Sequence, residues 1–515
     1  MMNDESGILS AAGQTPPAKG PIPDGQSPRL WRLGLRHFPH RSSFVILAFV
    51  ILLGGCAVGP NYKRPAIESP ANYRFAASLT TNSLADLPWW QVFKDPVLQD
   101  LIHTAVTNNY DLKQAVARVE QARQQAVAAR SPLFPQLGYN GGVGRGLNAL
   151  FNSPSPNLDR TGDALTASST LLTLNAAWEI DIWGRIRRLS QAARAQYLAT
   201  DEARRGVTIT LVSDVATTYF QLLELDQELE VQKAATNAYA GTYRIFNEKR
   251  INGVSSRLET DRASAAFADA AAAIPQIQLQ IATTENQISV LLGRNPGAIP
   301  RGAPLGQAAL TPDIPAGLPS ALLQRRPDVL ASEQSLIAAS ANIGANLANF
   351  FPQIGLTTFL GKVSPELSAF TAGSANAWNV GATMAGPIFQ GGQLLAQYRT
   401  AKASFDQAKA AYEQSVLTAF QEVSSALISR QKLAEVRVFD EQATTALTSS
   451  VQIATERYMN GKSSYYEVLQ AQQELYPTQR ALAQAQASEL IAVVQLYKAL
   501  GGGWQLPEAA QSGSK

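Results

Sequence analysis

Residues 172–182 read LTLNAAWEIDI, and their alternation decides the fold. The even positions carry apolar side chains, whereas the odd positions include threonine, asparagine, glutamate and aspartate. An alternation of this length predicts a strand with one apolar and one polar face. Residues 137–143 alternate in the same way, and the segment between the two, residues 144–164, is rich in Gly, Asn, Ser and Pro. The pattern therefore predicts a β-hairpin with a long polar loop.

This hairpin recurs, because the chain is a tandem repeat. The motif FPQL at residues 134–137 returns as FPQI at residues 351–354, an offset of 217 residues. Asn252-Gly253 and Leu292-Gly293 return at an offset of 208 residues. A run of matches with one change of offset predicts two copies of a single unit, and hence two hairpins and four strands.

The repeat divides the chain into segments. We expect a lipoprotein signal peptide at residues 1–55, an irregular arm at 56–97, the first repeat at 98–293, a Pro/Gly-rich linker at 294–317, the second repeat at 318–501 and a tail at 502–515.

Each copy continues into very long helices. Residues 393–459 contain neither glycine nor proline, and apolar side chains recur there with three- and four-residue spacing. A helix of this length extends about 100 Å. Its counterpart spans residues 185–250 and is broken only by Gly206 and Gly241. Because Asn-Gly ends the long helix in both copies and a second helix follows, we expect helical hairpins. The first copy also opens with one helical stretch over residues 98–130.

The composition argues against an enzyme. The chain contains one cysteine, Cys56, and three histidines, so it can form no intrachain disulfide and has few ligands for zinc or for a histidine-based triad. Its formal net charge is only +3 over 515 residues, which gives no electrostatic reason to bind nucleic acid. We therefore expect no catalytic residues, no cofactor, no metal and no nucleic-acid partner.

The N-terminus is typical of an exported protein. Four arginines precede the apolar run 44–53, which is too short to span a bilayer as a helix. The run ends in Leu53-Gly54-Gly55-Cys56, which resembles the bacterial lipobox. This resemblance implies that Cys56 is lipidated and becomes the first residue. Ala57 at the next position resembles lipoproteins that are sent to the outer membrane. The alternative is an ordinary export signal with an incidental cysteine.

Four amphipathic strands cannot close a sheet alone. In hydrocarbon an open sheet edge would leave its N–H and C=O groups unpaired, and membrane barrels contain eight or more strands. Several chains must therefore contribute strands. A dimer would give eight strands and a filled lumen, whereas a trimer would give twelve and room for a channel. The long helices would continue such a tube away from the membrane, which predicts a conduit.

Many motifs in order along the chain resemble the outer-membrane efflux factors of the TolC superfamily, and the NodT-type lipoproteins among them most. They are CAVGPNYKRP at residues 56–65, WW at 89–90, FPQL at 134–137, WEIDIWGR at 178–185, RRPDV at 325–329, FPQ at 351–353 and LYKALGGGW at 496–504.

The resemblance implies a mainly α fold with β structure. It would be a homotrimer whose twelve-stranded transmembrane β-barrel, with four strands from each chain, continues into a long periplasmic α-helical barrel. It also implies a tripartite pump, completed by a periplasmic adaptor (membrane fusion) protein and an inner-membrane transporter of the RND type. The chain itself would be a passive exit duct, lipid-anchored in the outer membrane.

The resemblance also implies a gate. In the family the periplasmic end closes where the last helix pairs converge, through acidic rings and tyrosine hydrogen bonds. The corresponding residues 457–470 contain the candidates Tyr458, Glu467 and Gln470. Family members often carry aspartate where this chain has Gln470, which leaves a single acidic ring. The alternative for each residue is an ordinary solvated helix surface.

Two other functions stay open. A lipoprotein that scaffolds a periplasmic assembly without a pore would explain the helices but would leave the four strands unused. An outer-membrane conduit for type I protein secretion would use the same fold. The cargo is not named by the sequence, although residues after Cys56 include only two methionines, Met384 and Met459, and so no methionine pathway for copper or silver.

Overall fold

The computed structural model describes residues 57–75, 83–147, 166–307, 317–364 and 367–504. The chain divides into two units, Met1–Gly54 and Gly55–Lys515, and all the described residues belong to the second. Cys56 and the expected signal peptide lie outside the described residues.

The first half contains two helices, a hairpin and two further helices. In chain order these are α3 (Pro96–Asn108), α4 (Tyr110–Arg130), β1 (Gln136–Leu147), β2 (Thr166–Ile180), α5 (Arg185–Ile251) and α6 (Arg257–Leu291). A short helix, α2 (Trp89–Val92), precedes them.

The second half repeats this order, after the short helix α7 (Pro319–Leu322). Its elements are α8 (Pro327–Ala348), β3 (Gln353–Ser364), β4 (Asn376–Ala385), α9 (Gln393–Met459) and α10 (Tyr465–Ala499). Helices α5 and α9 each have 67 residues, and α6 and α10 each have 35. Every bound of α9 and α10 lies 208 residues after its counterpart in α5 and α6. The predicted long helical hairpins are therefore confirmed.

The expectation of one helical stretch over residues 98–130 is wrong, because the stretch divides at Asn109. Asn109 leaves the helical conformation, and its side chain accepts a hydrogen bond from the Leu112 N–H at 2.9 Å, which caps α4. The division brings the chain against the end of α6, where a Cβ on Gly293 would lie 2.5 Å from the Asn108 carbonyl oxygen. Asn109 is a strong helix N-cap and so favours this break.

Two further boundaries differ from the expected ones. Strand β2 ends at Ile180 rather than at Ile182, because the Asp181 carboxylate accepts hydrogen bonds from the N–H groups of Ile186 and Arg187 and thereby starts α5. Helix α5 then continues through Gly206 and Gly241 without a break. Its tertiary contacts outweigh the cost of two glycines, about 1 kcal/mol each.

The four strands form one antiparallel sheet in the order β1-β2-β3-β4. The register places the apolar positions of all four strands on the same face, with Tyr139 opposite Leu174, Leu174 opposite Leu360, and Leu360 opposite Trp378. These side chains are largely exposed; Trp378, for example, is 74% exposed. The opposite face carries mostly small and polar residues, such as Asn140 and Asn175. The predicted amphipathic hairpins are confirmed.

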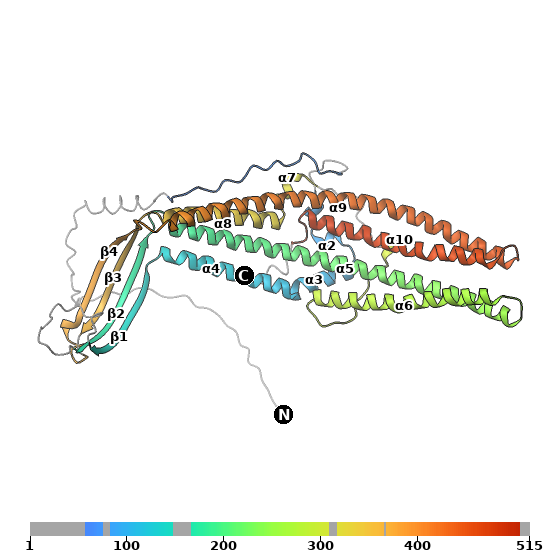
Figure 1. Cartoon of the computed structure of the whole chain (residues 1–515), viewed down its shortest axis with the longest axis horizontal. Coiled ribbons are helices and arrows are strands. Elements are labelled where there is room, and N and C mark those ends of the chain that lie inside the picture. Colours follow the sequence, from blue (N-terminus) through green and yellow to red (C-terminus); the bar gives the residue numbers. More distant parts are fainter. Residues whose placement is uncertain (1–56, 76–82, 148–165, 308–316, 365–366, 505–515) are drawn as a thin grey trace, which may run out of the picture. The chain divides into compact units, whose positions relative to one another are not determined.

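The helices extend away from the sheet, and the tips of the two helical hairpins lie at the opposite end of the helices (Figure 1). Helix α5 is central, because it packs on α4, α6, α8 and α10, whereas α9 packs on α8 and α10. The main core lies where the two halves meet and includes the fully buried Tyr219, Tyr412 and Tyr497. No helix in the described part of the chain combines the length and hydropathy needed to cross a membrane.

Candidate functional site at the hairpin tips

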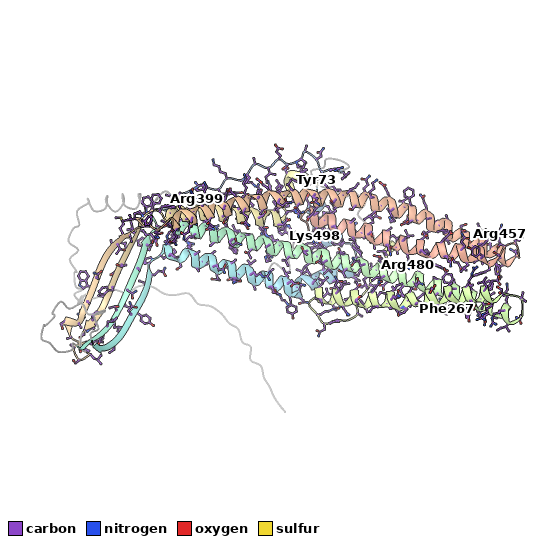
Figure 2. All side chains as sticks on the ribbon, in the orientation of Figure 1. Tyr73, Phe267, Arg399, Arg457, Arg480 and Lys498 are labelled. Atoms are coloured by element: carbon purple, nitrogen blue, oxygen red, sulfur yellow. The ribbon has the colours of Figure 1, made fainter. Side chains whose placement is uncertain are left out.

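The candidate gate residues lie around the turn that joins α9 to α10. Figure 2 shows Arg457 at this tip, at the far end of the helices from the sheet. The turn follows Met459 and contains Gly461 in the left-handed conformation, with φ of +68°. In the first half the turn between α5 and α6 is built in the same way, with Gly253 at +72°. Both Asn-Gly pairs therefore end a long helix as predicted.

Tyr458 joins the two hairpins. Its hydroxyl accepts a hydrogen bond from Lys249 Nζ of α5 at 2.5 Å. The same ammonium group lies 4.9 Å from the centre of the Tyr458 ring, and the Tyr458 ring packs edge-on against Tyr465 at 5.1 Å. A cation held against an aromatic ring and its hydroxyl adds an attractive electrostatic contact to the packing. Tyr458 is thus part of a contact between the first and second halves.

Tyr465, at the start of α10, extends this contact. Its hydroxyl hydrogen-bonds the hydroxyl of Thr242, and its ring packs edge-on against Phe246 at 4.9 Å. Burial raises the pKa of Tyr465 above its usual value, so the phenol stays neutral. The tips are therefore held together by two tyrosines of the second half against Thr242, Phe246 and Lys249 of the first.

Glu467 and Gln470 lie elsewhere, in a shallow groove between α9 and α10. The groove is also lined by Arg457 and Glu474. Arg457 Nε lies 3.5 Å from the Glu467 carboxylate, and each side chain is about half exposed, so the pair contributes little stability. Gln470 donates a hydrogen bond to the Glu474 carboxylate at 3.2 Å. The structure thus brings Glu467 and Gln470 together and leaves Tyr458 outside the groove.

The repeat counterpart of Glu467 is Glu259, which has a different role. Its carboxylate accepts hydrogen bonds from the Ser256 N–H at 2.9 Å and the Ser255 hydroxyl at 2.8 Å, and its own N–H bonds the Ser256 hydroxyl. The hydrogen bonds to the carboxylate lower the pKa of Glu259, and the one from the Ser256 backbone has the largest effect. Glu259 therefore caps its own helix, whereas Glu467 makes no such cap.

Within the described residues, no three His, Cys, Asp or Glu side chains gather as metal ligands would. The arrangement at the tips offers hydrogen bonds, aromatic packing and charge.

Comparison with known proteins identifies the family. The family model described as outer membrane efflux protein matches residues 101–294 and 318–502. The chain belongs to this family. It is 36% identical over 467 residues to the solvent efflux pump outer membrane protein SrpC of Pseudomonas putida, covering 89% of this chain and 98% of that one. It is 34% identical over 466 residues to the cation efflux system protein CusC of Escherichia coli, covering 89% and 99%.

Among solved structures, the open-state outer membrane channel MtrE of Neisseria gonorrhoeae is similar, with a TM-score of 0.78 and 30% sequence identity. The alignment covers 87% of this efflux protein and 99% of MtrE. The mostly helical fold with one small sheet is thus a fold of outer-membrane channels.

Sequence reasoning missed the first-half partners of this efflux protein's tip contact: Thr242, Phe246 and Lys249. They lie in the last turns of α5 before Asn252-Gly253, and only the pairing of the two hairpins brings them to Tyr458 and Tyr465. The tyrosines carried a usable signal, because two aromatic residues flank a turn that is otherwise polar.

A further missed residue, Arg188, fixes the arm that follows Cys56. The Arg188 side chain is buried and donates hydrogen bonds to the carbonyl oxygens of Val58 and Gly59 and to Asn61 Oδ1, at 2.9–3.3 Å. The Val58 N–H bonds the Trp183 carbonyl oxygen at 3.0 Å. The residues directly after Cys56 are thus held at the junction between the sheet and the helices.

Proposed function

We propose that this chain is the outer-membrane channel subunit of a tripartite efflux pump, a passive exit duct for small molecules from the periplasm to the exterior. The observation that carries the proposal is the exposed apolar face of the sheet. Leu137, Leu174 and Trp378 are 84%, 67% and 74% exposed, on strands whose other face is mostly polar or small. Such a face suits hydrocarbon on one side and water on the other. A periplasmic scaffold without a pore would leave it uncovered.

The native particle is a homotrimer in this proposal. The second half packs on the first through α5 with α8 and through α5 with α10. By repeat equivalence the same two contacts are expected for α9, against α4 and α6, but α9 packs on neither within one chain to a comparable extent. Neighbouring copies would supply them head to tail. Three copies give the twelve-stranded transmembrane barrel and the periplasmic helical barrel that the family resemblance implies.

The other partners are a periplasmic adaptor protein and an inner-membrane transporter of the RND type, which would energise transport. The names of the relatives support this, since SrpC belongs to a solvent efflux pump and CusC to a cation efflux system. We infer that this subunit catalyses no reaction, in keeping with a family of efflux channels.

Cys56 carries the lipid in this proposal. The support is positional: the described residues that follow it, from Ala57, dock beside Trp183 at the end of the sheet. A lipid attached one residue earlier would therefore start close to the expected membrane boundary.

The hairpin tips form the periplasmic gate. Tyr458 and Tyr465 hold the second hairpin to the first, and Glu467 and Gln470 line a groove that closes or opens as the tips move. Because threefold symmetry would bring three copies of Glu467 together, the entrance would favour cations.

The test combines assembly, conductance and the anchor. Native mass spectrometry of the detergent-extracted protein should give three copies, each starting at an acylated Cys56, and planar bilayers should show a cation-selective conductance. A monomer without conductance would overturn the channel, and a mature chain that keeps residues before Cys56 would overturn the anchor alone.

A further inference from the structure

A cavity of about 580 Å³ opens between α5, α8 and α9, in the part of these helices that adjoins the sheet (Figure 1). Small-molecule sites in proteins are typically cavities of about 300–1,000 Å³. Ala338 of α8 lines this cavity and also belongs to a cluster of alanines through which α5 and α8 pack. The size of the cavity is therefore that of a binding site, and its wall is made by packed helices.

The lining of the cavity is polar but uncharged. Of the twelve described residues that line it, five are asparagine or glutamine, three are serine or threonine, and four are alanine. The carboxamides of Gln196, Asn342, Gln393 and Gln397 are exposed and make no hydrogen bond with another group in the described part of the chain. Each carboxamide offers two N–H donors and an acceptor oxygen. The cavity thus presents free donors and acceptors without a charge.

The N-terminal arm contacts one face of α8. Arg64 and Tyr62 of the arm donate hydrogen bonds to the Glu333 carboxylate at 2.8 and 3.1 Å. Further along α8, a Cβ on Gly59 of the arm would lie 2.5 Å from the Gly344 Cα. Glu333 and Gly344 are about three turns apart and so share this face of the helix.

The cavity lies on the opposite face of α8. Ser335 lines the cavity and comes two residues after Glu333, a rotation of about 200° around the helix, and Asn342 lies about two turns beyond Ser335. The arm follows Cys56, which carries a lipid in the proposed function, so it has to lie where an acyl chain can reach the bilayer, outside the tube. The cavity on the other side of α8 therefore faces the inside of the proposed duct.

The charged residues of α9 in this stretch lie on another face of the helix. Arg399, Lys402 and Asp406 each follow a lining residue by two positions, which again is a rotation of about 200°. Figure 2 shows Arg399 near the end of α9 that adjoins the sheet. The uncharged lining is thus a property of one face and not of the whole stretch.

The repeat does not explain the uncharged lining. The first-half equivalents of Ser335 and Gln393 are Arg118 and Arg185, at the offsets of 217 and 208 residues. Arg185 pairs there with Glu179 at 2.7 Å. The polar, neutral lining is therefore particular to the second half of the chain.

We infer that the cavity between α5, α8 and α9 is a weak binding site inside the duct for neutral polyhydroxylated solutes, the chemical class of sugars and polyols. The inference rests on the proposed channel and adds which class of cargo this part of it favours. A hydroxyl group both donates and accepts hydrogen bonds, as the carboxamides and hydroxyls of the lining do. A charged solute would lose hydration and find no opposite charge. An aromatic hydrocarbon would leave the carboxamides without hydrogen bonds.

Saturation-transfer NMR on the full-length protein measures this binding, in a detergent without sugar headgroups. Glucose, glucosamine and gluconate are probes of similar size that are neutral, positive and negative at pH 6. Glucose should bind about fivefold more tightly than either charged probe, because only the charged probes lose favourable hydration without compensation.

Two variants of the exposed lining change this preference in different ways. Asn342→Ala combined with Gln397→Ala should weaken glucose binding by about fivefold, because it removes two free carboxamides. Asn342→Asp should strengthen glucosamine binding and weaken gluconate binding, each by about fivefold, because it adds a carboxylate to the cavity. The matched controls are Gln125→Ala and Gln125→Asp at the equivalent, likewise exposed position of α4, and they should change neither value.

Equal binding of the three probes, or unchanged glucose binding in the double alanine variant, would overturn the inference. Equal effects of the substitutions at Asn342 and Gln125 would also overturn it, because the binding would then lie outside the cavity. Native mass spectrometry and bilayer conductance of the same variants report separately whether the proposed trimeric channel stands.

Discussion

Helices α5 and α9 have the same length and the same place in the repeat, yet they differ in what covers them. Of 67 residues, 24 are buried in α5 and only 7 in α9. Both are uninterrupted helices, so helix propensity does not separate them. The difference is one of neighbours: α5 has helices of both halves around it, and α9 lies at an edge of the chain. The repeat thus accounts for the equal helix length, whereas the position among the other helices of the chain determines burial.

Equivalent residues of the two helices are equally buried in the middle, and their burial differs toward the tips. Val215 and its equivalent Val423 are both fully buried in the main core. Val231 is 9% exposed, whereas its equivalent Phe439 is 67% exposed. The exposed side of α9 carries further apolar residues, namely Leu417, Val436, Val438 and Ile453. Of these residues, Val436 and Val438 are neighbours of Phe439 in the sequence.

The largest expected effect is a difference in stability between substitutions at the equivalent positions Val231 and Phe439. Val231→Asp places a carboxylate among packed helices and should cost about 3–5 kcal/mol, because no partner neutralises it. Phe439→Asp should leave the folded chain intact and weaken only the trimer, because that side chain contacts solvent in one copy. Yield and thermal unfolding by circular dichroism measure the first effect, and native mass spectrometry the second. Equal unfolding of both variants would contradict the comparison.

The second contrast concerns the ends of α6 and α10. Asn109 donates a hydrogen bond to the Leu291 carbonyl oxygen at 3.0 Å, and its equivalent Arg326 donates one to the equivalent Ala499 carbonyl oxygen, also at 3.0 Å. Arg326 is buried and also pairs with Asp328 and Glu422, at 2.6 and 2.7 Å. The first half therefore uses the neutral amide of Asn109 at this position, and the second half uses the charged guanidinium of Arg326.

We expect Arg326→Ala to destabilise the protein by about 2 kcal/mol, because it removes a buried guanidinium and its charged hydrogen bond to the Ala499 carbonyl oxygen, whereas its partners Asp328 and Glu422 are half exposed and can be solvated. Asn109→Ala should cost about 1 kcal/mol, the value of a helix cap and one hydrogen bond. Urea unfolding of both variants measures the difference. If Asn109→Ala proved the more damaging, the two contacts would not be equivalent.

Much of this architecture was accessible from the sequence. Alternation over residues 172–182 and the glycine-free run 393–459 are local signals, so strands and long helices could be predicted, with errors only where a side chain such as Asp181 or Asn109 starts a helix early or late. Burial could not be predicted. Val231 and Phe439 are both apolar residues on similar helices, and only the neighbours distinguish them.

The candidate site likewise contains residues that the sequence could predict and residues that it could not. Tyr458, Glu467 and Gln470 were candidates through a motif, and the structure places the first against α5 and the other two in the α9–α10 groove. Lys249 and Thr242 could not be foreseen, because contacts between residues more than 200 positions apart leave no local pattern. Whether Glu467 lines an entrance stays a prediction.

A smaller effect on stability depends on pH, and it is also expected for only one half of the chain. Burial, and then the nearby Glu228, raises the pKa of Glu224 in α5 to about 7, while its equivalent in α9 is the exposed Lys432. Glu228 is buried and accepts a hydrogen bond from Gln484 at 2.7 Å. The folded state thus keeps the Glu224 proton to a higher pH than the unfolded state does.

Stability should therefore fall as pH rises from about 4.5 to 7, by about 1–2 kcal/mol after allowance for partial exposure. Glu224→Gln should remove this part of the pH dependence and be the more stable protein at pH 8. Lys432→Gln is the control and should keep it. Denaturant unfolding at pH 5 and pH 8 measures the difference, and an unchanged slope in Glu224→Gln would contradict the assignment.

The smallest effect on stability, and the most specific one on transport, concerns the equivalent pair Glu259 and Glu467. Glu259 is occupied by the helix cap at Ser256, so Glu259→Gln should cost a few tenths of a kcal/mol and leave ion selectivity unchanged. Glu467 makes only the half-exposed contact with Arg457, so Glu467→Gln should leave stability and assembly intact and lower cation selectivity in planar bilayers. Glu467→Lys should reverse the selectivity, because three negative charges become three positive ones. High salt should blunt both changes, since exposed charges are screened over about 10 Å at 0.1 M. Identical selectivity of the wild type and all three variants would make Glu467 an ordinary surface residue, and the two copies of this turn would then differ only in how their helices begin.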